Sequence, residues 1–164
     1  HDIEPGEIER VSVTSSGKGP QILQHDDHST GFEAKFSMPY TISCAIAHQQ
    51  VDLEAFDDEN IASSDVQSIR ERLTYETDSS LPFTSYETTV NIRTSNGAEY
   101  DGLKTSPPGR DGVPLSDAEL ERKFMMCAER GFKRPTARNL YSRLDNLHEN
   151  GVEDIERLMD MLCT

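Results

Sequence analysis

The chain has 164 residues, which is enough for one domain or for one domain with an appended subdomain. Its net charge is −14, and the acidic excess is dispersed along the sequence. Because nucleic acids and anionic membranes bind clustered cationic groups, this charge argues against both kinds of partner. The longest apolar run, residues 42–47, is far shorter than the roughly 20 residues that span a bilayer.

The first ten residues are acidic and contain no apolar stretch, so they do not resemble a secretion signal, and we expect a cytoplasmic protein. The chain starts without methionine, and we interpret it as part of a longer polypeptide. Lysine is scarce and aspartate abundant, which fits a halophilic, salt-rich cytoplasm as well as ordinary solubilising charge. The three cysteines lack CxxC spacing, which argues against disulfides and zinc; we expect Cys44 and Cys127 to be small core residues.

The first predicted elements are one strand and two helices. Apolar residues interleaved with polar ones predict a strand over 8–14, and the Gly-, Ser-, Asp- and His-rich segment 15–30 is typical of a loop. A helix is predicted over 37–48, with a proline tolerated in its first turn. A capping-box pattern at Ser64 predicts a second helix to about residue 72.

Three strands are predicted next, over 73–77, 86–94 and 98–105. The last two are joined by Asn96-Gly97, a dipeptide that favours the type I′ turn of a tight hairpin. A proline-rich break at 107–114 follows, and the rest reads as helix. The sequence therefore predicts an α+β fold, with a small antiparallel sheet and packed helices over 1–107 and a helical tail over 108–164.

The tail contains three predicted helices. Another capping box at Ser116 opens the first, which extends to about Gly131, and leucines at helical spacing mark the second around 140–147. Apolar periodicity over 152–162 predicts the third. Mass and sizing data would show whether the tail, without its partner domain, self-associates through Leu140, Leu144 and Leu158, which we expect to be exposed.

The string His25-Asp26-Asp27-His28 contains metal-ligand residue types. Adjacent ligands on a flexible loop rarely converge on one ion without further helpers, so we interpret the string as a solvated loop and predict no metal site. The sequence has no P-loop, no dinucleotide fingerprint and no GxSxG nucleophile motif.

The segment 31–40, GFEAKFSMPY, resembles a phrase of the MmgE/PrpD family, which includes 2-methylcitrate dehydratase and cis-aconitate decarboxylase. The resemblance extends to EIERVSV at 7–13, to the Asn-Gly hairpin, and to PLSDAELERKF at 114–124. These segments occur in family order and spacing over nearly the whole chain.

The resemblance implies a two-domain, homodimeric enzyme whose active site lies between a large helical domain and a smaller α+β lid. Residues 1–107 would form the lid, and 108–164 would rejoin a helical domain whose N-terminal part is not in this chain. The family dehydrates, decarboxylates or epimerises small di- and tricarboxylates, without a metal or organic cofactor in its usual members. On this interpretation the chain is a lyase or isomerase fragment that is inactive alone. The alternative is a free-standing α+β ligand-binding or interaction module without catalysis.

Tyr40 is the predicted catalytic residue, because cis-aconitate decarboxylase resembles this chain in having an active-site tyrosine in the matching S-x-x-Y phrase. A phenol in the first turn of a helix can donate to a substrate carboxylate or pass a proton. Met38 and Ile42 form the apolar stripe of this helix, and Tyr40 falls off it, which argues against a core aromatic. Lys35 and Ser37 are predicted to bind substrate, although Ser37 fits the helix N-cap better than a catalytic role.

Overall fold

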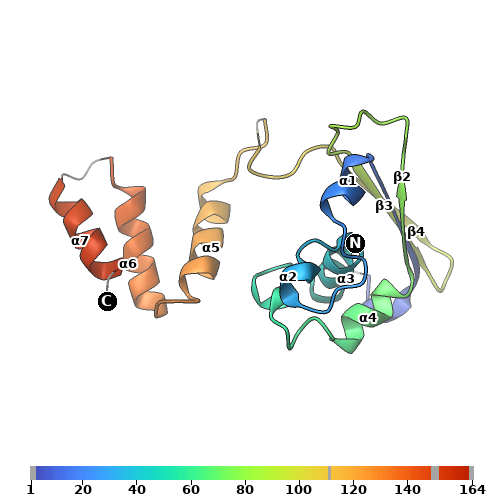
Figure 1. Cartoon of the computed structure of the whole chain (residues 1–164), viewed down its shortest axis with the longest axis horizontal. Coiled ribbons are helices and arrows are strands. Elements are labelled where there is room, and N and C mark those ends of the chain that lie inside the picture. Colours follow the sequence, from blue (N-terminus) through green and yellow to red (C-terminus); the bar gives the residue numbers. More distant parts are fainter. Residues whose placement is uncertain (1–2, 111, 149–151, 163–164) are drawn as a thin grey trace. The chain divides into compact units, whose positions relative to one another are not determined.

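The computed structural model describes residues 3–110, 112–148 and 152–162, with the side chains of 152–154 left out (Figure 1). It divides into two compact units, His1–Val113 and Pro114–Thr164. The division falls in the connection after the last strand, the same connection that contains the predicted break at residue 107. None of the described helices combines the length and apolarity that a bilayer crossing requires.

Unit 1 contains a four-stranded sheet in the order β2-β1-β3-β4. The strands are β1 (Ile8–Ser15), β2 (Leu73–Thr77), β3 (Thr88–Thr94) and β4 (Glu99–Lys104). The predicted α+β class is confirmed, and the sheet is mostly antiparallel, but β2 runs parallel to β1. A parallel neighbour requires a crossover connection, which here is the helical segment between β1 and β2.

A β-bulge between Ile8 and Arg10 lets two consecutive side chains, Glu9 and Arg10, point to the open face of the sheet. Ile8 then returns to the covered face, where it is 3% exposed, beside the fully buried Val11. The bulge thus preserves the apolar inner face while it places two charged groups side by side outside.

The β3–β4 hairpin is confirmed, but its predicted type I′ turn is wrong. That turn needs a positive φ at both central residues, whereas among the described residues only Gln49 and three glycines, Gly97 included, have one. The Gly97 amide donates to the Thr94 carbonyl at 2.8 Å, which closes a turn whose last residue is left-handed. The Asn96 side chain accepts from the Thr94 hydroxyl and the Ala98 amide instead of entering the left-handed region.

Four helices lie on one side of the sheet (Figure 1). They are α1 (Lys18–Ile22), α2 (Gly31–Ala34), α3 (Met38–His48) and α4 (Ser64–Arg70), with single 3₁₀ turns at Pro5–Glu7 and Glu54–Phe56. The last two were predicted, but the capping box predicted at Ser64 is absent, because Ser63 is the N-cap of α4 and its side chain makes no cap hydrogen bond. The prediction of a loop over 15–30 is wrong at α1, because tertiary contacts hold it: a Cβ on Gly19 would meet the Tyr75 phenol oxygen at 2.2 Å.

Helix α3 separates two apolar clusters. Ile42 and Ile46 pack against the sheet cluster around Val11 and Ile69, whereas Tyr40 and Cys44 belong to a second cluster. The other buried members of the second cluster are Ala34, Ile61 and Val66. The inference that Tyr40 lies off the apolar surface of α3 is therefore wrong, because this helix is covered on two sides.

Unit 2 contains α5 (Asp117–Ala128), α6 (Arg134–Asp145) and α7 (Val152–Leu162). The predicted capping box at Ser116 is present. Cys127 is exposed, so its prediction as a core residue is wrong, whereas Cys44 is buried as predicted. Leu140 and Leu158 are also buried, at 2% and 5% exposure, so the expectation that they are exposed is wrong, whereas Leu144 is 45% exposed.

Candidate functional site

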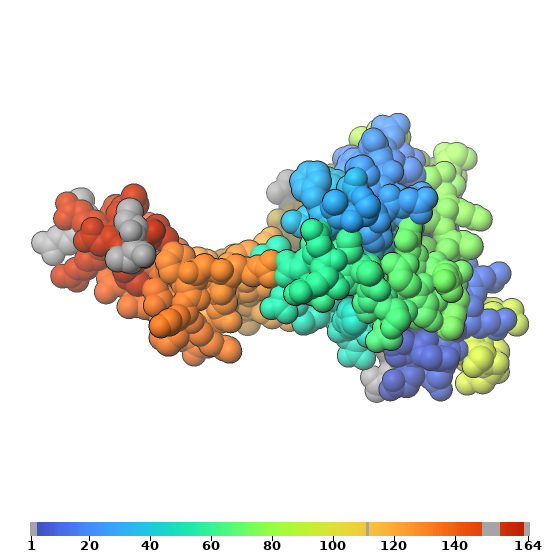
Figure 2. Space-filling view, turned by 60° about the horizontal axis from the view of Figure 1, so that its bottom comes forward, coloured from blue at the N-terminus to red at the C-terminus, as the bar shows by residue number. Residues whose placement is uncertain are grey.

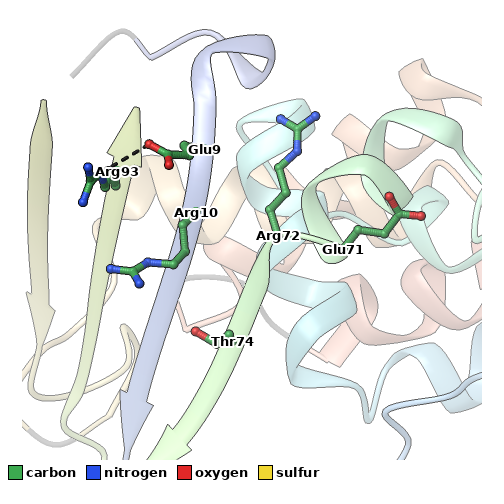
Figure 3. A pocket seen from close by; sticks show the side chains of 6 residues that line it. All are labelled: Glu9, Arg10, Glu71, Arg72, Thr74 and Arg93. Carbon is green, nitrogen blue, oxygen red and sulfur yellow. Dashed lines mark ion pairs between the residues drawn. The ribbon is translucent and has the colours of Figure 1, made fainter. Parts of the chain in front are cut away.

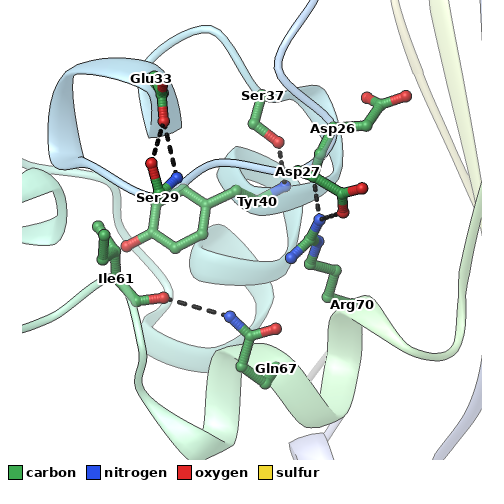
Figure 4. A network of polar contacts seen from close by, with 9 residues as sticks. All are labelled: Asp26, Asp27, Ser29, Glu33, Ser37, Tyr40, Ile61, Gln67 and Arg70. Atoms are coloured by element: carbon green, nitrogen blue, oxygen red, sulfur yellow. Dashed lines mark hydrogen bonds and ion pairs between the residues drawn. The ribbon is translucent and has the colours of Figure 1, made fainter.

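Residues 31–40 contain helix α2 and the first turn of helix α3, and each helix has its own N-terminal cap (Figure 4). At α2, Thr30 Oγ1 accepts from the Glu33 amide at 3.2 Å, and Glu33 accepts from the Ser29 amide and hydroxyl. At α3, Ser37 Oγ accepts from the Tyr40 amide at 3.2 Å. These bonds satisfy amides that helix starts leave unpaired, and they fix the direction of the turn between the two helices.

Gly31 brings α2 against the backbone of the 54–61 segment. Its amide donates to Asp58 Oδ1 at 2.7 Å, and a Cβ built at this position would lie 1.7 Å from the Phe56 carbonyl oxygen. Only a residue without a side chain fits this contact. In the space-filling view, the blue segment around α2 lies beside the green segment that follows α3 (Figure 2).

Tyr40 is 1% exposed, and its hydroxyl donates to the Ala55 carbonyl in the same 54–61 segment. Its ring lies edge-on to the His28 imidazole, with centroids 4.6 Å apart, and 6.0 Å from the Phe56 ring. Burial, and secondarily the neighbouring Cys44, raises the pKa of Tyr40 to about 12. The phenol is neutral at physiological pH, as an ordinary tyrosine is, and it can donate a hydrogen bond; the raised pKa makes it a weaker acid than a solvent-exposed tyrosine.

The two predicted substrate-binding residues occupy different surroundings. Lys35 is exposed, and its Nζ lies 5.9 Å from the centroid of the Phe56 ring, within reach of a cation–π contact. Ser37 is fully buried, and it is the N-cap of α3, as its place in the sequence suggested. Lys35 and Tyr40 thus meet at the same aromatic ring, whereas the Ser37 hydroxyl is engaged with the backbone.

His28 joins this cluster, so the prediction that it belongs to a solvated loop is wrong. Its Nδ1 atom is buried without a hydrogen-bond partner, and burial, followed by the charge of Arg70, lowers its pKa. Asp27 forms an ion pair with Arg70 at 3.2 Å, so the side chains of the 25–28 string have separate partners. Within the described residues, no three His, Cys, Asp or Glu side chains converge to hold a metal ion.

A hollow of about 280 Å³ opens beside Tyr40. Its polar and charged lining includes His48, Asp52, Glu54 and Asn60, with Cys44 and Ala55 next to the phenol. Burial raises the pKa of the Cys44 thiol, with a smaller contribution from the Asp52 charge, which makes the thiol a poor nucleophile. The chemistry available here is hydrogen bonding and proton donation by Tyr40, once its bond to Ala55 is exchanged for another acceptor.

Several of these groups have no recognisable signature in the sequence. The Tyr40 acceptor is a backbone carbonyl, Ala55, which carries no side-chain signature, and Asp58 is one acid among many in an acidic loop. His28 was noticed only as a possible ligand, because its contact with Tyr40 depends on how the loop folds back on α3.

The chain is an α+β domain with a helical appendage, in which a capped helix start presents a tyrosine beside a polar hollow. A family model described as the MmgE/PrpD C-terminal domain matches residues 1–149, and the chain belongs to this family as its C-terminal portion. A search of the curated proteins gave no match.

Proposed function

We propose that this chain is the lid and C-terminal helical portion of a cofactor-independent lyase or isomerase that acts on small di- or tricarboxylates. The reaction begins with removal of a proton next to a carboxylate and ends with loss of water, loss of CO₂ or reprotonation. The observation that carries the proposal is the family match over residues 1–149, together with the phrase that positions Tyr40.

In this proposal Tyr40 is the catalytic residue and Lys35 attracts the carboxylate. The Tyr40 phenol is protonated at physiological pH, so it can donate a hydrogen bond to a developing negative charge. Its hydrogen bond to the Ala55 carbonyl must first be released, through movement of the phenol or of the 54–56 turn. Ser37 contributes to binding through the helix start that it caps, rather than through its own buried hydroxyl.

The second candidate function is a ligand-binding or interaction module without catalysis. One observation favours it: the polar groups of Gly31, Ser37 and Tyr40 are all engaged by atoms of this same chain. On this view residues 31–40 have a structural role only, which is to hold α2, α3 and the 54–61 segment together.

The two candidates are separated by assaying the intact protein that contains this chain against 2-methylcitrate, cis-aconitate and iminodisuccinate. Turnover of at least one acid, with no turnover by the 164-residue chain alone, supports the lyase or isomerase. If the intact protein turns over none of the three but binds one of them saturably, the enzymatic proposal fails and the binding module stands.

A further inference from the structure

Three arginines lie in a row across the open face of the sheet (Figure 3). Arg10 on β1 and Arg93 on β3 are direct register partners, and Arg72 immediately precedes β2, whose Leu73 pairs with Val11. They surround a shallow hollow of about 380 Å³ whose remaining lining is Glu9, Glu71 and Thr74. The row therefore spans β3, β1 and the residue that precedes β2, and every residue that lines the hollow is polar or charged.

Like charges directly opposite each other on neighbouring strands destabilise a sheet, so the Arg10–Arg93 pair requires an explanation. Glu9 compensates only Arg93, through a contact of 3.3 Å between Oε2 and Nε. Arg72 donates from Nη1 to the Ile8 carbonyl at 2.6 Å, which fixes the side chain without neutralising it. Across the described parts of the chain, no ion pair involves Arg10 or Arg72.

The bulge in β1 creates this arrangement. Without it, Glu9 and Arg10 would point to opposite faces, and either Arg10 or Glu9 would enter the apolar core. With it, Glu9 reaches Arg93, and Arg10 remains beside them with its guanidinium toward β3 (Figure 3). The Glu71 carboxylate, by contrast, points away from Arg10 and Arg93 in the same view.

We propose that the arginine row of Arg10, Arg72 and Arg93 binds a small multivalent oxyanion, either a phosphate-bearing or a polycarboxylate metabolite. Guanidinium groups bind both kinds of oxyanion through paired hydrogen bonds, and a lining made only of polar and charged residues suits a hydrophilic ligand. The net charge of −14 repels anions elsewhere, so binding depends on this local excess of positive charge.

This site goes beyond the proposed catalytic function. Tyr40 lies in the helical layer that covers the opposite face of the sheet, and Val11 and Val13 fill the interior between the two. A failure of anion binding at the arginine row would therefore leave the reaction proposed for Tyr40 unaffected, and the converse also holds.

Isothermal titration calorimetry of the 164-residue chain with pyrophosphate and with citrate, at constant ionic strength, tests the proposal. Saturable binding of one or both supports the site and identifies the phosphate or the carboxylate source. Acetate, a monovalent control, should bind much more weakly. The absence of saturable binding by both multivalent anions, or binding of acetate with equal affinity, overturns the proposal.

Variants locate the binding on the chain. Arg10→Gln should weaken it roughly ten- to hundredfold, the effect of losing one charge-assisted contact. Arg138→Gln is the matched control, because it removes the same charge from an exposed position on α6. An equal loss of affinity in both variants would show a general charge effect and overturn the site. Both positions are exposed, and thermal unfolding checks that each variant folds like the parent chain.

Discussion

Replacing Gly31 by alanine places a methyl group where the structure has no space. The new Cβ would lie 1.7 Å from the Phe56 carbonyl oxygen, about half of a normal contact, so the two backbone segments must separate. Overpacking of this kind costs about 1–3 kcal/mol. Separation also stretches the 2.7 Å bond from the Gly31 amide to Asp58, a bond to a charged group worth about 1.5–3 kcal/mol.

We therefore expect Gly31→Ala to lower the free energy of unfolding by about 3–5 kcal/mol. For a chain of this size that corresponds to a fall in Tm of roughly 6–20 °C, measured by circular dichroism or calorimetry. Gly6→Ala is the matched control in the same unit, because a Cβ there meets nothing within 4 Å. A Gly31→Ala variant whose Tm matches that of Gly6→Ala would refute the close packing of α2 on the 54–61 segment.

Two further predictions follow from burial. Because burial lowers the pKa of His28, the unfolded chain binds a proton more readily than the folded chain, and stability should fall as pH drops below 6.5. His28→Gln should flatten this fall between pH 7.5 and 5.5 in urea unfolding, with His48→Gln at an exposed position as the matched substitution control. A His28→Gln variant whose stability falls with pH as steeply as that of the parent chain would contradict this prediction. In a Cys163→Ser background, a thiol reagent should modify exposed Cys127 quickly and buried Cys44 only on unfolding, and fast modification of both would disprove the second apolar cluster.

Several elements were predicted from local patterns, although the capping box expected at Ser64 and the type I′ turn expected at Asn96-Gly97 are absent. The N-cap at Ser37, the capping box at Ser116 and the alternation in β3 each act within a few residues, and all three elements are present. Features that depend on distant partners were missed. Helix α1 is held by contacts with Tyr75, and the parallel pairing of β2 depends on the whole crossover between the strands.

For the candidate site too, the local segment was predicted from the sequence and its contacts with distant residues were not. The resemblance to the family identified the phrase 31–40 and its tyrosine, and the family is confirmed. Amphipathic periodicity could not show that α3 is covered on two sides, because a helix between two clusters has two apolar faces instead of one stripe. The contacts of Tyr40 with Ala55 and His28 arise only when separate loops fold onto the helix start.

The most direct test of the proposed function is kcat/KM of a Tyr40→Phe variant of the intact protein on its carboxylate substrate. Tyr75→Phe is the matched control, because it also loses a phenol hydrogen bond, 2.6 Å from Ser15, in the same unit. If Tyr40 donates a proton in the reaction, Tyr40→Phe should lower kcat/KM by about 100-fold or more, while Tyr75→Phe leaves it unchanged. A folded Tyr40→Phe enzyme with the kcat/KM of the parent would contradict a catalytic role for this tyrosine.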